Sequence, residues 1–352
     1  GDIGKKIHTG RSRNDQVLVA LKVFFRSYIL NTIPKMERLV DLLIQQADKY
    51  RDIFLPGYTH LQVAMPSSFG LWFSAYAESL MDDLLHWQAA FRISNRNPLG
   101  SGAGYGSSFP LDRDLTTELL GFDGIHQNVV YAQMGRGRTE LSVAQAMAIT
   151  AQSINRFAMD ACLYLSQNFA FIKLPPAYTT GSSIMPHKKN PDVFEIMRGR
   201  CNQIMALPNQ IMMLLGNLPS GYHREMQLLK ESVFPAMDDL NDVLDAMLAI
   251  IPHIEPANAI LDDDKYRYLF TVDAVHEKVR KGMTFRDAYK AVGDEIETGS
   301  YTFDPHSATP HSLQGSIGNL GLNRLSERLK SLIESFDSIT IKKAESNLFS
   351  SE

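Results

Sequence analysis

A series of long segments with helical periodicity constrains the fold of this chain more than any other feature of its sequence. The first segment runs from Asn14 to Tyr50, with apolar residues at helical spacing, and contains Pro34 as an expected kink. We expect Asn14 and Asp15 to cap this helix. At 1.5 Å per residue the helix is about 50 Å long, more than a small domain spans. The sequence therefore predicts an elongated helical protein.

Four more segments have the same periodicity, at about residues 66–94, 140–167, 190–217 and 223–251. Pro66 fits the first turn of the first of these helices. Asn190, Pro191 and Asp192 fit the cap, the first-turn proline and the acidic first turn of the third. Many of the helices are apolar on more than one face. This pattern favours a five-helix bundle whose outer faces pack on other subunits.

The helical segments become shorter after about Pro256, at residues 266–281 and 284–298, and a polar loop precedes one last helix. We therefore expect an all-α fold with two parts. A central bundle of five long helices covers residues 1–255, and a smaller C-terminal helical domain covers residues 256–352.

The charge and hydropathy of the chain exclude two classes of partner. The formal net charge is -4, and basic and acidic residues are interspersed, so we expect neither nucleic acid nor an anionic membrane surface as a partner. The sequence also contains no run of about 18 apolar residues and no signal-peptide pattern. We therefore expect no membrane-spanning segment.

Metal and nucleotide sites are not predicted either. The ten histidines show no HExxH and no other paired arrangement with a carboxylate, which predicts no metal ligand set. Cys162 and Cys201 lie in apolar helical patterns and are interpreted as small buried thiols, which fits a reducing cytoplasm. Residues 95–113 contain a G-x-G-x-G spacing without a preceding apolar strand. We interpret them as a shaped turn rather than a dinucleotide-binding loop.

The stretch TTGSSIMPHKKNPDVFE, at residues 179–195, is the first candidate for chemistry. Its Gly-Ser-Ser sequence forms a flexible turn with hydroxyl groups, and Lys188 and Lys189 add positive charge. Asn190 and Pro191 open a helix whose N-terminal dipole favours an anion. Such a loop suits closure over a carboxylate or phosphate of a substrate. The alternative is a solvated surface loop.

Three other stretches hold polar residues beside helix ends. In GYTHLQ, at residues 57–62, His60 falls in a short turn between two helices, where an imidazole can act as an acid or a base. HTGRSRNDQ, at residues 8–16, carries two arginines that can fork onto carboxylates. Gln227 and Lys230, in GYHREMQLLK, are three apart and can meet one ligand. Each of these stretches taken singly also fits a structural or solvated role.

Together, HTGRSRNDQ, GYTHLQ and GSSIMPHKKNP resemble the three signature regions of the argininosuccinate lyase family, within the fumarase and aspartase superfamily. The resemblance extends over essentially the whole chain. It implies a cytoplasmic carbon–nitrogen lyase of arginine biosynthesis that cleaves argininosuccinate to arginine and fumarate without a metal or an organic cofactor. It also implies a homotetramer with a multi-helix core, in which different subunits contribute the signature regions to each active site.

The resemblance assigns roles to individual residues. Ser182 and His60 match the acid/base pair, Glu195 matches an acidic residue that orients the histidine, and Lys188 would stabilise a dianionic intermediate. We expect Ser182 to accept the proton and His60 to donate one, and the reverse assignment stays open. The matched substrate-binding residues are Arg13, Asn14, Thr59, Asn190, Tyr222, Gln227 and Lys230.

The sequence departs from the family pattern at three places. His187 stands where glutamine is commoner, and Leu228 and Leu229 replace acidic residues often found beside Gln227. Family members carry an N-terminal helical domain before the first signature region, whereas only seven residues precede His8 here. Two alternatives therefore stay open beside the lyase: a related lyase that acts on another succinyl adduct, and a non-catalytic structural protein on the same scaffold.

Overall fold

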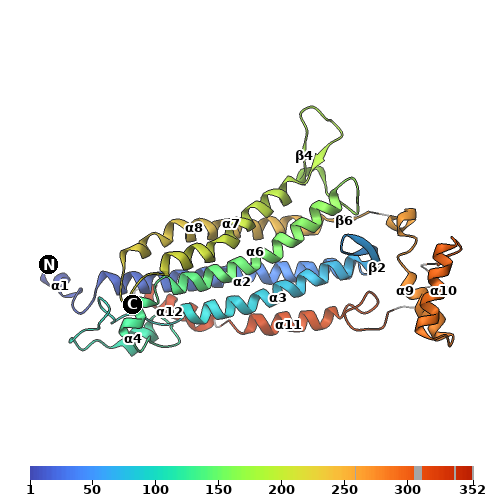
Figure 1. Cartoon of the computed structure of the whole chain (residues 1–352). Helices are drawn as coiled ribbons and strands as arrows, with labels where there is room; N and C mark the ends of the chain where they lie inside the picture. The colour runs from blue at the N-terminus through green and yellow to red at the C-terminus, as the bar shows by residue number, and fades with distance from the viewer. Residues whose placement is uncertain (258, 305–310, 337, 351–352) are drawn as a thin grey trace.

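A computed structural model of the chain describes residues 1–257, 259–304, 311–336 and 338–350. Five long helices among these residues run side by side and form an elongated bundle (Figure 1). They are α2 (Arg13–Lys49), α3 (Phe69–Ser94), α6 (Arg138–Leu165), α7 (Asp192–Leu215) and α8 (Leu229–Ile250). The expected all-α fold with a central five-helix bundle is confirmed.

Shorter elements connect these helices and follow them. The short helices are α1 (Asp2–Lys6), α4 (Arg113–Leu119), α5 (Val129–Met134), and the 3-10 helices η1 (Pro176–Tyr178), η2 (Arg224–Gln227), η3 (Ile251–His253), η4 (Ile260–Asp262) and η5 (Asp264–Tyr266). Antiparallel strand pairs are formed by β1 (Phe54–Thr59) with β2 (Gln62–Ser68), β3 (Ile172–Lys173) with β6 (Glu255–Pro256), and β4 (Thr180–Gly181) with β5 (Lys189–Asn190).

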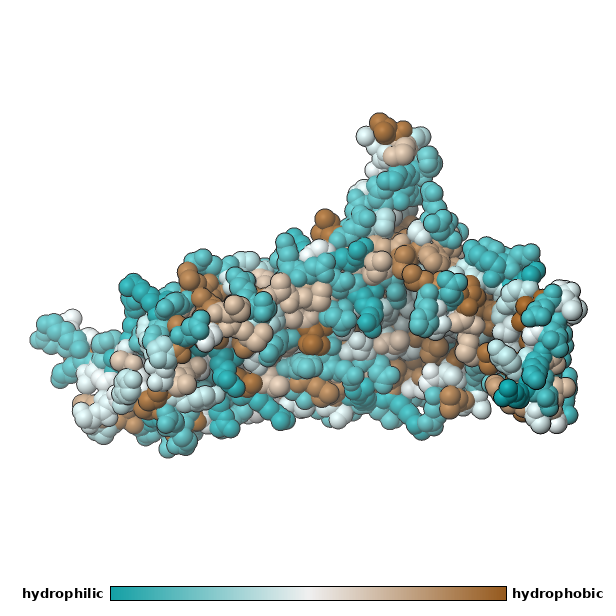
Figure 2. All heavy atoms as spheres, in the orientation of Figure 1, coloured by the Kyte–Doolittle hydropathy of each residue, from teal (hydrophilic) through white to brown (hydrophobic). Residues whose placement is uncertain are grey.

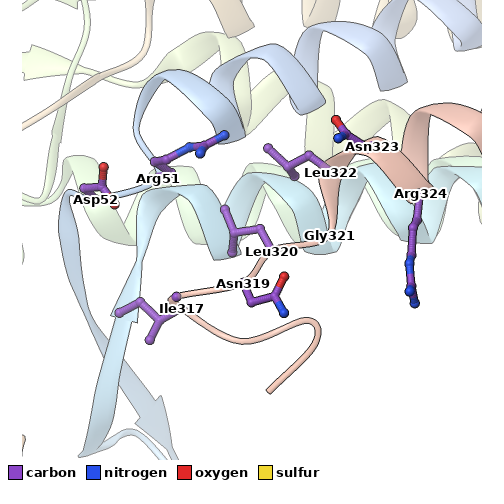
Figure 3. Close-up of a pocket in the computed structure, with 10 residues that line it drawn as sticks. Arg51, Asp52, Ile317, Asn319, Leu320, Gly321, Leu322, Asn323 and Arg324 are labelled. Atoms are coloured by element: carbon purple, nitrogen blue, oxygen red, sulfur yellow. The ribbon is translucent and has the colours of Figure 1, made fainter. Parts of the chain in front are cut away.

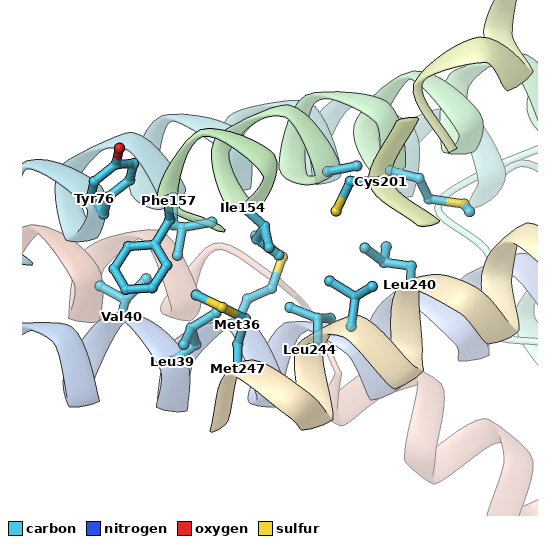
Figure 4. Packing of buried hydrophobic residues seen from close by; sticks show 14 of the residues in the cluster. Met36, Leu39, Val40, Tyr76, Ile154, Phe157, Cys201, Leu240, Leu244 and Met247 are labelled. Carbon is cyan, nitrogen blue, oxygen red and sulfur yellow. The ribbon is translucent and has the colours of Figure 1, made fainter. Parts of the chain in front are cut away.

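The hydrophobic core follows the bundle axis where α2, α6, α7 and α8 meet. Figure 4 shows Met36 of α2 and Phe157 of α6 near Met247 of α8, and each of these side chains is at most 1% exposed. Cys201 of α7 lies in the same core, and burial raises the pKa of its thiol to about 12. Cys162 is only half-buried, so the prediction of a buried thiol holds for Cys201 alone.

The residue that caps α2 differs from the prediction. Ser12 is the N-cap, and its hydroxyl oxygen accepts the N–H of Asn14 at 3.2 Å. The carboxylate of Asp15 reaches back to accept the N–H of Ser12 at 2.9 Å, which completes a capping box. The prediction that Asn14 caps the helix was therefore wrong, because Asn14 already lies in the first turn. Pro34 lies inside α2 as expected.

By length and composition alone, α2 is apolar enough to cross a membrane, and it is the one described helix of which this is true. Half of its most apolar stretch is buried inside the bundle, as in a core helix. The helix also buries two cations. Lys22 donates to the carbonyl of Ile93 at 2.9 Å, and Arg26 donates to the side-chain oxygen of Asn95 at 3.1 Å. Burial lowers the pKa of Lys22 to about 8.

The segment between α2 and α3 is a β-hairpin rather than the short turn expected from the sequence. Thr59 pairs with Gln62, and the two residues at the tip, His60 and Leu61, have φ values of 53° and 59°. Two consecutive left-handed residues match the twist of a two-residue hairpin turn. Pro66 lies in β2, so its predicted place in the first turn of α3 was wrong. The hairpin therefore places His60 in an exposed position at one end of the bundle.

The C-terminal part of the chain contains two kinds of packing. The helices α9 (Thr271–Arg280) and α10 (Phe285–Glu297) share a small cluster of their own, formed by Ala274, Val275, Ala288 and Val292. The helices α11 (Leu322–Glu334) and α12 (Ile339–Phe349) stand where one last helix was expected, and α11 packs along α2 and α3 (Figure 1). The division at residues 255 and 256 stays a prediction, and residues 305–310 of the polar loop lie outside the described residues.

Candidate active site

The site residues predicted from the sequence lie at opposite ends of the bundle (Figure 1). One end holds the start of α2 and the segment from α7 to α8, with Arg13, Asn14, Tyr222, Gln227 and Lys230. The other end holds the β1–β2 hairpin, the β4–β5 hairpin and the start of α7, with Thr59, His60, Ser182, Lys188, Asn190 and Glu195. The 37 residues of α2 place about 55 Å between its start and the β1–β2 hairpin, and the 24 residues of α7 place about 36 Å between the β4–β5 hairpin and the segment with Tyr222. One chain therefore does not bring all of these residues together.

The β4–β5 hairpin stands out from the bundle above α6 and α7 (Figure 1). Thr180 pairs with Asn190, and Gly181 pairs with Lys189. The side chain of Asn190 donates to the Thr180 hydroxyl at 3.4 Å, and that hydroxyl donates to the carboxylate of Asp192. Asn190 therefore lies in a strand and does not cap α7, contrary to the prediction; the cap position is held by Pro191 without a side-chain bond.

The turn at the tip of this hairpin donates hydrogen bonds to Ser182. The hydroxyl oxygen of Ser182 accepts the backbone N–H of Ile184 at 3.4 Å and that of Met185 at 3.1 Å. Hydrogen-bond donors of this kind favour the negatively charged form of an oxygen. The N–H of Lys188 donates to the carbonyl of Met185 at 3.0 Å, which closes the turn, while the lysine side chain is exposed. The backbone thus donates two hydrogen bonds to the side-chain oxygen of Ser182.

The outer surface of this hairpin is apolar at its tip. Figure 2 shows hydrophobic atoms at the end of the protrusion, where the side chain of Ile184 is 83% exposed. At the same end of the molecule, His60 and Glu195 are both exposed, and no hydrogen bond or ion pair joins either of them to another side chain in the described ranges. Their predicted pairing is not formed within this chain and stays a prediction for an assembly.

At the other end of the bundle, two predicted substrate residues are already in contact. The side-chain amide of Gln227 donates to the hydroxyl of Tyr222 at 2.8 Å. Gln227 lies in η2 and Lys230 in α8, so the expected fifth helix is interrupted between them. Leu228 is 51% exposed, whereas Leu229 is buried in the core. The first of these substituted leucines therefore faces outward beside Gln227.

Asp15 connects the start of α2 to residues 95–113, which are called the Gly-rich loop below. Its carboxylate, which is fully buried, accepts the N–H of Gly102 at 3.0 Å besides that of Ser12. This contact fixes Asn14, the neighbouring residue, beside the loop. The sequence identified Asp15 only as a helix cap, and its position directly after Asn14 in the first signature region is the signal that points to a larger role.

Comparison with known proteins agrees with the signature regions. Residues 1–206 match the lyase family. The argininosuccinate lyase of Parabacteroides distasonis is 57% identical over 348 residues, which cover 99% of this chain and 78% of that protein, and that of Bacteroides fragilis strain YCH46 is 55% identical with 99% and 77% covered. The chain belongs to the argininosuccinate lyase family.

Two solved structures of other enzymes have the same fold as this chain. An EDDS lyase variant with bound fumarate matches with a TM-score of 0.85 at 22% identity, covering 99% of this chain and 78% of the other. A class II fumarase from Schistosoma mansoni matches with a TM-score of 0.70 at 17% identity, covering 94% and 71%. At these identities the likeness concerns the fold alone.

A buried ion pair lies at the end of the bundle that holds Tyr222. Arg136 Nε lies 2.7 Å from a carboxylate oxygen of Glu140, and the other oxygen of Glu140 accepts the N–H of Gly137 at 2.7 Å. Arg136 also donates to the carbonyl of Met226 at 3.0 Å, which joins η2 to α6. A cavity of about 290 Å³, lined in part by Gly221, opens beside this pair. Arg136 and Glu140 are four residues apart in GRGRTE, and this i,i+4 spacing of opposite charges is the sequence signal for the pair.

A second hollow of about 500 Å³ lies outside the predicted site of this lyase family member. Figure 3 shows it between Arg51 and Asp52 after α2 and residues 317–324 before and within α11. Arg51 is paired with Asp48, and Arg324 donates to the side chain of Gln314 at 3.0 Å. None of the residues that line it is among the catalytic or substrate-binding residues predicted from the family resemblance. Among the described residues, no group of three or more His, Cys, Asp or Glu side chains is arranged to hold a metal ion.

Proposed function

We propose that this chain catalyses the reversible elimination of argininosuccinate to L-arginine and fumarate. The observation that carries the proposal is the identity of 54–57% over 99% of the chain to proteins named argininosuccinate lyase. A carbon–nitrogen bond breaks, a carbon–carbon double bond forms, and one proton moves from carbon to the departing guanidino nitrogen. The chemistry needs a base, an acid, and cations that stabilise a dianionic intermediate.

Ser182 is proposed as the base. Its oxygen, as an alkoxide that accepts two backbone N–H hydrogen bonds, takes the proton from the carbon next to a carboxylate and becomes the hydroxyl. Lys188 and the N-terminus of α7 provide positive charge for the intermediate. His60 donates a proton to the guanidino nitrogen, oriented by Glu195, while the exposed hairpin tip closes over the site. The remaining matched residues hold the substrate: Arg13, Asn14, Thr59, Asn190, Tyr222, Gln227 and Lys230.

The separation of the two ends supports a homotetramer with shared active sites. Residues about 36–55 Å apart along one bundle meet only if the ends of neighbouring subunits lie side by side. The outer surface of α7 carries exposed apolar side chains that suit such packing, because Ile196 is 63% exposed and Met213 is 73% exposed. A cytoplasmic location and a role in arginine biosynthesis are part of the same proposal, and the free thiols of the chain agree with a reducing compartment.

The test is to add argininosuccinate to the purified chain and to measure fumarate by its ultraviolet absorbance and arginine by a separate assay. Equimolar release of the two products is expected. Turnover of other succinyl adducts without release of arginine would overturn the proposal in favour of a related lyase. An assembled protein without turnover of any such adduct, repeated with a longer gene product, would indicate a non-catalytic member of the family.

A further inference from the structure

Tyr105 is a large exposed side chain on an unusually constrained loop. Its side chain is 76% exposed. Around it, Gly100, Gly102, Gly104 and Gly106 all have positive φ values, of 81°, 60°, 123° and 80°. Alternating positive φ values coil the backbone tightly, and residues with a Cβ rarely adopt them. The loop therefore presents the ring of Tyr105 on a backbone that this glycine pattern permits.

Buried hydrogen bonds fix the backbone of this loop. The carbonyl of Ser101 accepts the N–H of Gly106 at 2.9 Å, and Gly102 donates to Asp15. Gln133, which is fully buried, donates to the hydroxyl of Ser101 at 3.0 Å and to the carbonyl of Gly102 at 3.1 Å. A backbone fixed by this many contacts loses little further entropy when its exposed side chain binds a ligand.

Tyr105 lies between the two groups of predicted substrate residues at this end of the bundle. Its hydroxyl is 3.7 Å from the position that a Cβ on Gly221 would occupy. Gly221 directly precedes Tyr222, whose hydroxyl is bonded to Gln227. The other side of the loop is fixed beside Asn14 through the neighbouring aspartate. The ring therefore stands next to the proposed binding region rather than on a remote surface.

We propose that Tyr105 is a specificity-determining residue that stacks on the guanidinium group of the substrate. The inference rests on the proposed function and deepens it. A guanidinium is planar, always charged and weakly hydrated, and it binds well on an aromatic face. The carboxylates of the succinyl part, in contrast, gain nothing from a ring face. Tyr105 therefore acts on the arginine side of the reaction and not on the fumarate side.

The experiment measures both directions of the reaction for the parent chain and for Tyr105→Ala, Tyr105→Leu and Tyr105→Phe. In the synthesis direction, the KM for arginine is expected to rise about tenfold in the alanine and leucine variants, as for loss of a cation–π contact. The KM for fumarate should stay within about twofold, since the ring contacts the guanidinium of arginine and not fumarate. The phenylalanine variant keeps the ring and should resemble the parent. Tyr289→Ala, which removes a tyrosine 65% exposed on α10, is the matched control.

Other outcomes overturn the inference. An unchanged KM for arginine, or equal increases for arginine and fumarate, would show that the ring does not select the guanidinium. Dissociation of the assembly in Tyr105→Leu and Tyr105→Ala, seen by light scattering, would make Tyr105 an interface residue. Failure of the parent chain to release arginine from argininosuccinate would reject the proposed function itself, and the inference with it. The parent and the variants therefore distinguish the two failures.

Discussion

The carboxylate of Asp15 accepts the backbone N–H of Gly102 at 3.0 Å, although 87 residues separate them in the chain. The same carboxylate accepts the N–H of Ser12, and the side chain is fully buried. One acidic residue thus fixes both the start of α2 and the Gly-rich loop. This contact connects the predicted substrate residue Asn14 to the loop that carries the exposed ring of Tyr105.

We predict that Asp15→Asn destabilises the chain and weakens substrate binding. An asparagine has one acceptor oxygen in place of two, so one buried N–H loses its partner, at a cost of about 1–3 kcal/mol in the free energy of unfolding. The KM for argininosuccinate should rise because the loop and Asn14 lose their common anchor. Denaturant unfolding and steady-state kinetics measure these two effects.

Asp112→Asn is the control for this prediction. Asp112 caps α4 by accepting the N–H of Leu115 at 2.8 Å in an exposed position, and asparagine caps a helix equally well. This variant should unfold like the parent. If Asp15→Asn also unfolds like the parent and keeps its KM, the anchoring role assigned to Asp15 is wrong.

We predict that Ser182→Ala lowers kcat by about 10²–10⁴-fold, the usual contribution of a general base. The assembly should be preserved, because the serine side chain lies in an exposed turn and not in the core. The neighbouring Ser183, which is exposed and bonded to no described side chain, supplies the control variant Ser183→Ala, expected to keep most of the activity. Parental turnover in Ser182→Ala would remove this serine from the mechanism.

We predict that two inactive variants from opposite ends of the bundle restore activity when mixed. Ser182→Ala and Lys230→Met, unfolded and refolded together, form mixed assemblies in which some shared sites receive both intact ends. Fumarate release measures the recovery. Ser182→Ala mixed with Lys188→Met is the control, because both residues lie on one loop and no site regains an intact copy. Equal recovery in both mixtures would contradict the shared arrangement.

We predict that Asp83→Asn stabilises the chain at neutral to alkaline pH. Burial raises the pKa of Asp83 to about 7, and its side-chain oxygen Oδ2 has no hydrogen-bond partner. The folded state therefore keeps the proton over a range in which the unfolded state has released it. The contribution of the protonated Asp83 to the free energy of unfolding is complete below the pKa of this group in the unfolded chain. It is lost as the pH rises towards 7, by up to about 4 kcal/mol at 1.36 kcal/mol per pKa unit.

Thermal unfolding of Asp83→Asn and the parent between pH 4 and pH 8 measures this effect. The substitution should reduce the loss of stability over that interval, because an amide does not ionise. Asp41→Asn, at an exposed position of α2, should leave the pH dependence of the parent unchanged. Parallel curves for Asp83→Asn and the parent would show that Asp83 does not titrate as described.

The sequence by itself determined the helical architecture and the family of this protein. Long runs of apolar residues at helical spacing leave a chain few ways to bury them, so the five long helices followed from local periodicity. Helix ends were less certain, because a cap depends on which neighbouring side chain reaches the first free N–H groups. Ser12 holds that position in α2 in place of the predicted Asn14, and Ser68 holds it in α3, which begins after the predicted first-turn residue Pro66.

Only the tertiary structure decided which residues meet. The contact of Asp15 with Gly102 and the hydrogen bond from Arg136 to the carbonyl of Met226 depend on how distant segments of the chain pack, and no local pattern specifies them. The bundle also separates the two groups of signature residues by the length of α2. The physical reason is that a rigid helix fixes the distance between its ends, which sequence motifs, read one after another, do not express.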